Sequence, residues 1–347
     1  MTNKEAYYFI GHSLALGCVV NRHKKIIDQI NADLVDWDKV IYLASNHLVL
    51  PTLYVKYRDH NVLPFLPIDL QEHLVLIHRL NFERNNAIIA QARKVKDILK
   101  KENIEPIFLK GCANIFDHLY SDIGERMMLD IDFLVNPEQI NRAAELLKED
   151  GYDTYKGVMF YEKSTKHYPR LTKSDEVVDI EIHFRPVSEE NSKGIDYHTI
   201  KSSQKIIFDS DWTVPCDQDK LMINFLHAQL ENAGYRKKKS SMRELYDGFL
   251  LTQRVEMKEF SDSLNCKKAA DAYFGLMSEV FGLSNFDFFE SSNQTKRYIS
   301  IHNYLLNHPV FHKADKLFID FKAAIASPKL IIHRLNKIYC AQLKNRS

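Results

Sequence analysis

Three short segments decide the fold of this chain: Ile-Phe-Leu-Lys-Gly (residues 107–111), Leu-Asp-Ile-Asp-Phe-Leu-Val (129–135) and Val-Asp-Ile-Glu-Ile-His-Phe (178–184). Each contains an apolar run typical of a strand, and the first ends at a Lys-Gly corner. Because side chains on a strand alternate between its faces, Asp130 and Asp132 project from the same side, roughly 7 Å apart. The sequence therefore predicts buried strands that carry acids in an alternating register.

A third acid extends this pattern. Glu181, on a neighbouring strand, completes a patch of three carboxylates with Asp130 and Asp132, and Asp179 on the same face is its rival. Carboxylates a few Å apart resist joint ionisation unless cations lie beside them. Oxygen ligands of this kind suit Mg²⁺, and pairs of such ions hold triphosphates. Because the flanking residues predict a buried strand, the pattern favours a metal site over a solvated strand face.

The ordered set of motifs resembles a known family. The motifs are Leu109-Lys110-Gly111, Arg126, Asp130-Ile131-Asp132 and Glu181-Ile182-His183. They are similar to the signatures of an uncharacterised bacterial nucleotidyltransferase family within the DNA polymerase beta-like superfamily. The resemblance implies an α/β fold with a mixed sheet of the nucleotidyltransferase type. It also implies that Asp130, Asp132 and Glu181 are catalytic and bind Mg²⁺, with Mn²⁺ as the alternative. The donor would be an NTP, with ATP expected.

Four further residues are candidates for binding the nucleotide. Gly111 would let the backbone approach phosphate at the start of a helix, and Lys110 would add positive charge. Arg126 could hold the triphosphate bidentately, or it could neutralise the acid cluster without ligand. His183 could orient the neighbouring acid, accept a proton or lie beside the metal; a structural histidine is the alternative. Cys112 stands where the wider superfamily usually has Ser or Gly, and a small buried thiol is expected there.

Periodicity predicts three regions: a helical region over 1–103, the α/β core over 104–214 and a second helical region over 215–347. Helices are expected over 70–101, 113–120 and 137–150, with Gly151 ending the last. Strands are expected around 158–162, 167–171 and 177–184, and we interpret His167 as a core or edge residue of the second.

Composition limits the class of protein. The net charge of +1 argues against a generally basic nucleic-acid-binding protein. No run of about 18 apolar residues predicts a membrane span. The five scattered cysteines contain no Cys-x-x-Cys and favour reduced thiols in the cytoplasm over disulfides or a zinc site. We therefore expect a cytoplasmic enzyme without a membrane partner.

The acceptor of the nucleotidyl group is left open by the sequence, as a small molecule, a protein or RNA. The basic run over 235–243 is either a solvated loop or a patch for a polyanionic acceptor. His227, Arg243 and Asp247 could cover the nucleotide, or Arg243 and Asp247 could form a simple pair within one helix. The alternative functions are a regulatory module that binds NTP and metal without transfer, and a toxin- or antitoxin-like modifier of RNA or protein.

Overall fold

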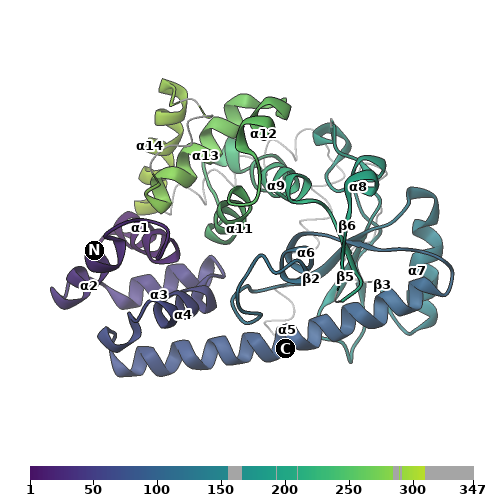
Figure 1. Cartoon of the computed structure of the whole chain (residues 1–347), viewed down its shortest axis with the longest axis horizontal. Coiled ribbons are helices and arrows are strands. Elements are labelled where there is room, and N and C mark those ends of the chain that lie inside the picture. Colours follow the sequence, from purple (N-terminus) through teal and green to yellow (C-terminus); the bar gives the residue numbers. More distant parts are fainter. Residues whose placement is uncertain (155–165, 193, 209, 284–288, 290, 309–347) are drawn as a thin grey trace, which may run out of the picture.

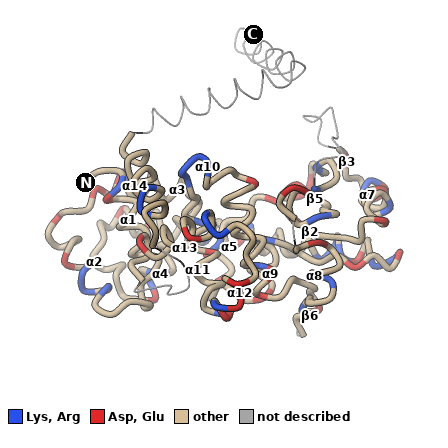
Figure 2. Tube along the Cα trace, turned by 90° about the horizontal axis from the view of Figure 1, so that it is seen from above, with Lys and Arg blue, Asp and Glu red and all other residues tan. Residues whose placement is uncertain are grey.

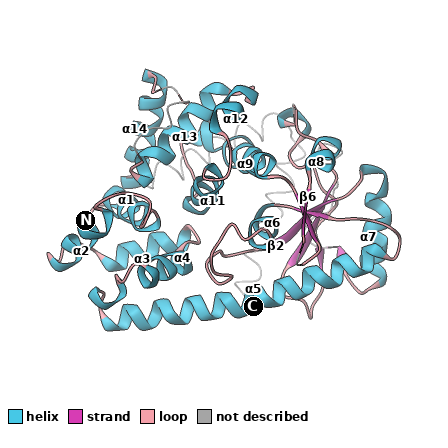
Figure 3. Ribbon diagram, in the orientation of Figure 1, coloured by secondary structure: helices cyan, strands magenta, loops and turns pink. Residues whose placement is uncertain are grey.

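The long helix α5 (Ile68–Lys100) runs along the whole molecule and supports two parts, one helical and one built on a sheet (Figure 1). The computed structural model describes residues 1–154, 166–192, 194–208, 210–283, 289 and 291–308. Figure 3 shows the strands gathered at one end of α5 and helices at the other. The sheet has parallel and antiparallel neighbours, so the predicted mixed α/β fold is confirmed.

The helical part is built from both ends of the chain. α1 (Asn3–Leu14) packs against α13 (Lys267–Phe281) and α14 (Asn293–Asn307), and Tyr7 and Phe274 lie in one apolar core. The first and last predicted regions therefore share a core. The other helices are α2 (Arg22–Asn31), α3 (Trp37–Asn46), α4 (Leu50–Asp59), α9 (Asp217–Leu226), α10 (Gly234–Lys237), α11 (Met242–Thr252) and α12 (Met257–Ser263).

Helix α5 confirms the helix predicted over 70–101, within two residues at its start. Ile88, Ala92, Val95 and Leu99 recur at intervals of three or four residues and are buried. They belong to the apolar core of the sheet part, together with residues of the strands. This stripe fixes the sheet on one half of the helix.

The main sheet has the strand order β1-β2-β5-β4-β3. Its central pair, β2 (Asp130–Leu134) and β5 (Asp179–His183), is parallel, whereas the other pairs are antiparallel. The remaining members are short: β1 (Ile107–Phe108), β3 (Asp153–Thr154) and β4 (Leu171–Thr172). The apolar residues of β2 and β5 are fully buried, which explains why both read as nearly continuous hydrophobic runs.

The connecting elements differ in part from the predictions. The helix expected over 113–120 is α6 (Lys110–Phe116), which begins directly at the corner. The segment 137–150 forms a 3-10 turn followed by α7 (Ile140–Glu149), and Gly151 ends it with φ +95°. The sequence did not predict α8 (Tyr197–Ser203) or the small sheet of β6 (Lys205–Ile207) and β7 (Trp212–Val214). Three-residue strands are too short for periodicity to reveal.

Two predictions concern segments at the margin of what is described. The strand expected over 158–162 lies outside the described residues, as does the part of the predicted second helical region that follows residue 308. The strand expected over 167–171 is reduced to β4 and an isolated bridge between His167 and His183. No helix in the described ranges is both long and apolar enough to span a lipid bilayer.

Candidate functional site

The two central strands place four carboxylates on one face of the sheet. Asp132 lies opposite Glu181, and Asp130 lies opposite Asp179. Because side chains alternate along each strand, all four share the face predicted for Asp130 and Asp132. His183, two residues after Glu181, continues the same row. The parallel register therefore assembles side chains that are far apart in the chain.

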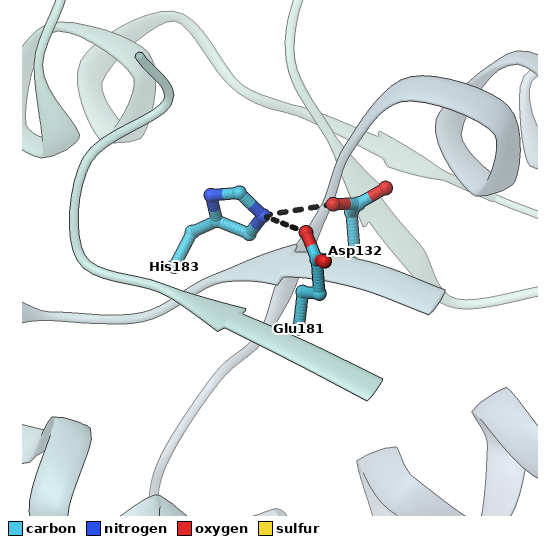
Figure 4. Close-up of side chains that lie close together, drawn as sticks. All are labelled: Asp132, Glu181 and His183. Carbon is cyan, nitrogen blue, oxygen red and sulfur yellow. Dashed lines mark hydrogen bonds and ion pairs between the residues drawn. The ribbon is translucent and has the colours of Figure 1, made fainter. Parts of the chain in front are cut away.

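Asp132, Glu181 and His183 form a compact buried group at the centre of this row (Figure 4). Nε2 of His183 lies 2.8 Å from Oδ1 of Asp132 and 3.6 Å from Oε2 of Glu181. One ligand atom from each residue lies within 4.8 Å of the others, so the group could hold a metal ion. Asp130 borders the group and its side chain is 27% exposed, against 3% for Asp132.

Lys110 brings a positive charge to the buried acids. Its Nζ lies 2.7 Å from Oδ1 of Asp132. Lys110 has a left-handed φ of +48°, which is uncommon for a residue other than glycine, at the turn from β1 into α6. Strained backbone of this kind often occurs at functional sites. Lys110, predicted to bind phosphate, therefore also neutralises the charge of Asp132, which the sequence predicted to bind the metal.

Arg170 brings a second positive charge, which the sequence did not predict. Its guanidinium donates to Glu181, with Nε 3.1 Å from Oε1, and lies 3.5 Å from Asp130 and 3.6 Å from Asp179. Its side chain is 38% exposed, whereas the acids below it are more deeply buried. Figure 2 shows acidic and basic residues close together around β5. The alternating pattern of residues 167–171 is the local signal that could have indicated Arg170.

The acids differ in how their charge is held. Burial by itself would raise the pKa of Asp132, but Lys110 and the hydrogen bond with His183 outweigh it and hold that pKa well below its usual range. Burial opposes ionisation of Glu181 as well, yet the bond with His183 lowers its pKa to about 2. Burial and then the charge of Asp132 raise the pKa of Asp130 to about 6. Asp130 is therefore the acid that holds a proton most readily.

Arg126 pairs with a carboxylate from the C-terminal helices. Its Nε and Nη2 lie 2.9 and 2.7 Å from the two carboxylate oxygens of Asp247 on α11, which also accepts a hydrogen bond from Tyr120. Both ends of this bidentate pair are buried. A Cβ on Gly111 would collide with the Arg126 guanidinium, so Gly111 permits a close approach of this side chain. Among the described residues Arg126 makes no ion pair with the strand acids, which Lys110 and Arg170 neutralise.

The acids line a cleft between the sheet and the C-terminal helices. One cavity, of about 300 Å³, is bordered by Asp130, Asp132 and Glu181. A smaller one, of about 50 Å³, is bordered by residues of α9 and α11. The two cavities share four lining residues: Lys110, Arg126, His227 and Arg243. Helices α9 and α11, which we call the helical wall, therefore contribute cations to the same cleft that holds the acids.

The helical wall differs from the sequence predictions. Asp247 pairs with Arg126, and no ion pair within the described residues joins it to Arg243, so the simple pair within one helix, which the sequence left open as an alternative, is not formed. Arg243 instead donates to the carbonyl oxygen of Met127. In the basic run, Lys238 stacks on Tyr235 at 4.3 Å, whereas Arg236 is exposed. Cys112 is buried, as predicted, and burial raises the pKa of its thiol.

Comparison with known proteins connects this cleft to a protein family. The model of a family described as uncharacterised nucleotidyltransferase matches residues 33–282, which include the sheet, the cleft and most of the C-terminal helices. No curated protein and no solved structure matches the chain.

Proposed function

The chain belongs to the uncharacterised nucleotidyltransferase family, and we propose that it transfers a nucleotidyl group from an NTP, with ATP the expected donor, to an acceptor in a Mg²⁺-dependent reaction. The observation that carries this proposal is the convergence of Asp132, Glu181 and His183 beside Asp130 on two parallel strands. Family membership supports the reaction class, and the acid group supports the dependence on metal.

The donor set fits a divalent cation. Asp132 and Glu181 would hold the ion with their carboxylate oxygens, flanked by Asp130 on one side and His183 on the other. Carboxylate oxygens suit Mg²⁺, and an added imidazole suits Mn²⁺ as well. Such an ion would supply Lewis-acid stabilisation of charge on the phosphate oxygens. Arg170 and Lys110 already offset the repulsion between these acids. A bound cation would replace these two side chains or share this role with them.

The charge of the cleft fits a triphosphate. The larger cavity is lined by three acids and by five lysine and arginine side chains: Lys110, Arg126, Lys166, Arg170 and Arg243. If the acids are occupied by metal, the remaining surface is strongly positive, and phosphate oxygens are its natural ligands. Lys110 would bind the phosphates nearest the acids, because it already lies beside Asp132. This arrangement supports the phosphate-binding roles predicted for Lys110 and Gly111, whereas the guanidinium of Arg126 is already bound bidentately by Asp247.

The transfer would be an in-line substitution at the α-phosphorus. The acceptor hydroxyl gives its proton to a strand carboxylate, of which Asp130 holds a proton most readily. Its oxygen forms a bond to that phosphorus, while the bond from the α-phosphorus to the bridging oxygen breaks and pyrophosphate leaves. The chain itself would hold the nucleotide in position and stabilise charge with Lys110 and Arg170.

Incubation with α-labelled nucleotides tests the proposal. Each of the four α-³²P-labelled NTPs is added with Mg²⁺ or Mn²⁺ to a cell extract containing the protein, and labelled small molecules, protein and RNA are separated. We expect label in one class, lost with Asp132→Asn and kept with Asp153→Asn, which changes an exposed acid on β3. Binding of NTP without labelling or pyrophosphate release would favour the regulatory module instead.

A further inference from the structure

Two arginines border both cavities of the cleft, Arg126 from the loop before β2 and Arg243 from α11, and only one of them has a carboxylate partner. Arg126 is bound bidentately by Asp247. No carboxylate of the described residues lies within ion-pair distance of Arg243, although it borders both cavities. Its Nη1 donates to the carbonyl oxygen of Met127 at 2.9 Å, which is its one hydrogen bond within the described part of the chain. Its charge therefore has no direct compensation.

The surroundings make this lack of compensation costly. Nε of Arg243 is shielded from solvent and has no hydrogen-bond partner among the described residues. Burial and then the charge of Arg126 lower the pKa of Arg243, and the nearby charges of Asp247 and Glu244 oppose this only in part. A guanidinium that is partly removed from water next to a like charge is stable only if its donors find an acceptor. An anionic ligand in the cleft would supply that acceptor.

We infer that Arg243 binds the polyphosphate of the nucleotide from the helical side of the cleft, opposite the strand carboxylates. This inference rests on the proposed function, because it takes the cleft as the nucleotide site. Arg243 shares the larger cavity with Lys110 and the three acids, so a phosphate chain held at the acids lies within the same enclosure. The planar guanidinium offers Nε and Nη2 side by side, which matches two phosphate oxygens.

The placement of Arg243 on α11 predicts which ligands it recognises. Lys110 is at the start of α6, whereas Arg243 is the last residue of the basic run over 235–243 and lies in the first turn of α11. A ligand that binds both residues therefore links the sheet part to the helical part. We expect AMP to gain little from Arg243, because a single phosphate held at the acids would leave this arginine without a partner. ATP and inorganic tripolyphosphate are long enough to contact both the acids and Arg243, so their affinity should depend on Arg243.

Calorimetric titration of the full chain with Mg²⁺ and tripolyphosphate, ATP or AMP tests this inference. Arg243→Gln should weaken tripolyphosphate and ATP roughly 10- to 100-fold, the range of hydrogen bonds to charged groups, and change AMP by less than about threefold. Arg243→Lys, which keeps the charge without the fork, should be intermediate. Arg236→Gln, a loss of an exposed arginine from the same basic run, should bind all three as the wild type does.

The unfolding curve of the apo protein separates binding from a purely structural role. Arg243→Gln should leave apo stability unchanged or raise it, since it removes a partly buried charge that has no ion pair among the described residues. Equal tripolyphosphate affinity in the wild type and Arg243→Gln would overturn the inference, as would a wild type that binds neither tripolyphosphate nor any NTP. Polyphosphate binding that depends on Arg243 in a protein that labels no acceptor would uphold the inference and defeat the proposed transfer.

Discussion

The two walls of the cleft solve the problem of buried charge differently. On the sheet, strand register brings acids together, and Lys110 and Arg170 reach over them as internal cations. On the helical side, Asp247 of α11 is paired with Arg126 from the loop before β2, but Arg243 of α11 is left with a backbone carbonyl. Under the proposed function, a metal ion would take over the role of Lys110 and Arg170 at the sheet, and Arg243 on the helical side would bind an anion. A metal–triphosphate complex would satisfy both walls at once.

The largest effect on activity is expected from a change to the acids of the sheet. Asp132→Asn should lower nucleotidyl transfer by about 10³-fold or more, because it removes a proposed metal ligand and the partner of both Lys110 and His183. A loss of that size corresponds to about 4 kcal/mol of transition-state stabilisation. Steady-state rates with the labelled acceptor, compared with Asp153→Asn, check it. Retention of a tenth of wild-type activity would contradict the assignment.

The next largest effect is expected from breaking the ion pair between Arg126 and Asp247. Arg126→Gln leaves Asp247 buried without its ionic partner, and we expect the free energy of unfolding to fall by about 3–5 kcal/mol. Denaturant unfolding of the apo protein measures this. Removing both charges, with Arg126→Gln and Asp247→Asn together, should cost less than the sum of the single changes. A stability loss below about 1 kcal/mol in Arg126→Gln would mean that the pair does not stabilise the packing of α11 against the loop before β2.

The raised pKa of Asp130 makes the stability of the apo protein depend on pH. Its folded pKa of about 6 exceeds its unfolded value, so ionised Asp130 destabilises the apo fold above pH 6, and this cost vanishes as the pH falls below 4. Asp130→Asn should therefore raise apo stability by about 1–2 kcal/mol at pH 8 and by almost nothing at about pH 3.5. Urea midpoints at the two pH values check it. Equal midpoint shifts at both would refute the pH dependence.

The smallest expected effect separates the two acids that compete for the role of third ligand. Glu181 lies in the buried group with Asp132, whereas Asp179 lies beyond it and touches Arg170 at 3.6 Å. Glu181→Gln should weaken Mn²⁺ binding about tenfold or more, and Asp179→Asn by about twofold or less. Calorimetric titration with Mn²⁺ measures both. The reverse order would make Asp179 the ligand.

The difference between the walls also explains what the sequence could predict. Asp130, Asp132 and Glu181 lie on strands whose alternating pattern shows which side chains share a face, so their convergence could be predicted. Nothing local indicates that Arg126 meets Asp247, 121 residues away, because that contact depends on how α11 packs against the loop before β2. Arg243 could not be singled out from the basic run for the same reason. Motifs on paired strands can be read from a sequence, whereas a wall assembled from distant helices needs the tertiary structure.

The most direct test of the central claim is a thermal unfolding curve with Mg²⁺ and ATP together. A ligand that binds only the folded state at about 100 times its Kd adds about 2.7 kcal/mol of stability, so the wild type should melt at a clearly higher temperature with both than with either alone. Asp132→Asn should lose most of that gain, while Asp153→Asn should keep it. A wild type without a metal-dependent shift for any NTP, or an Asp132→Asn protein with the full shift, would contradict the account.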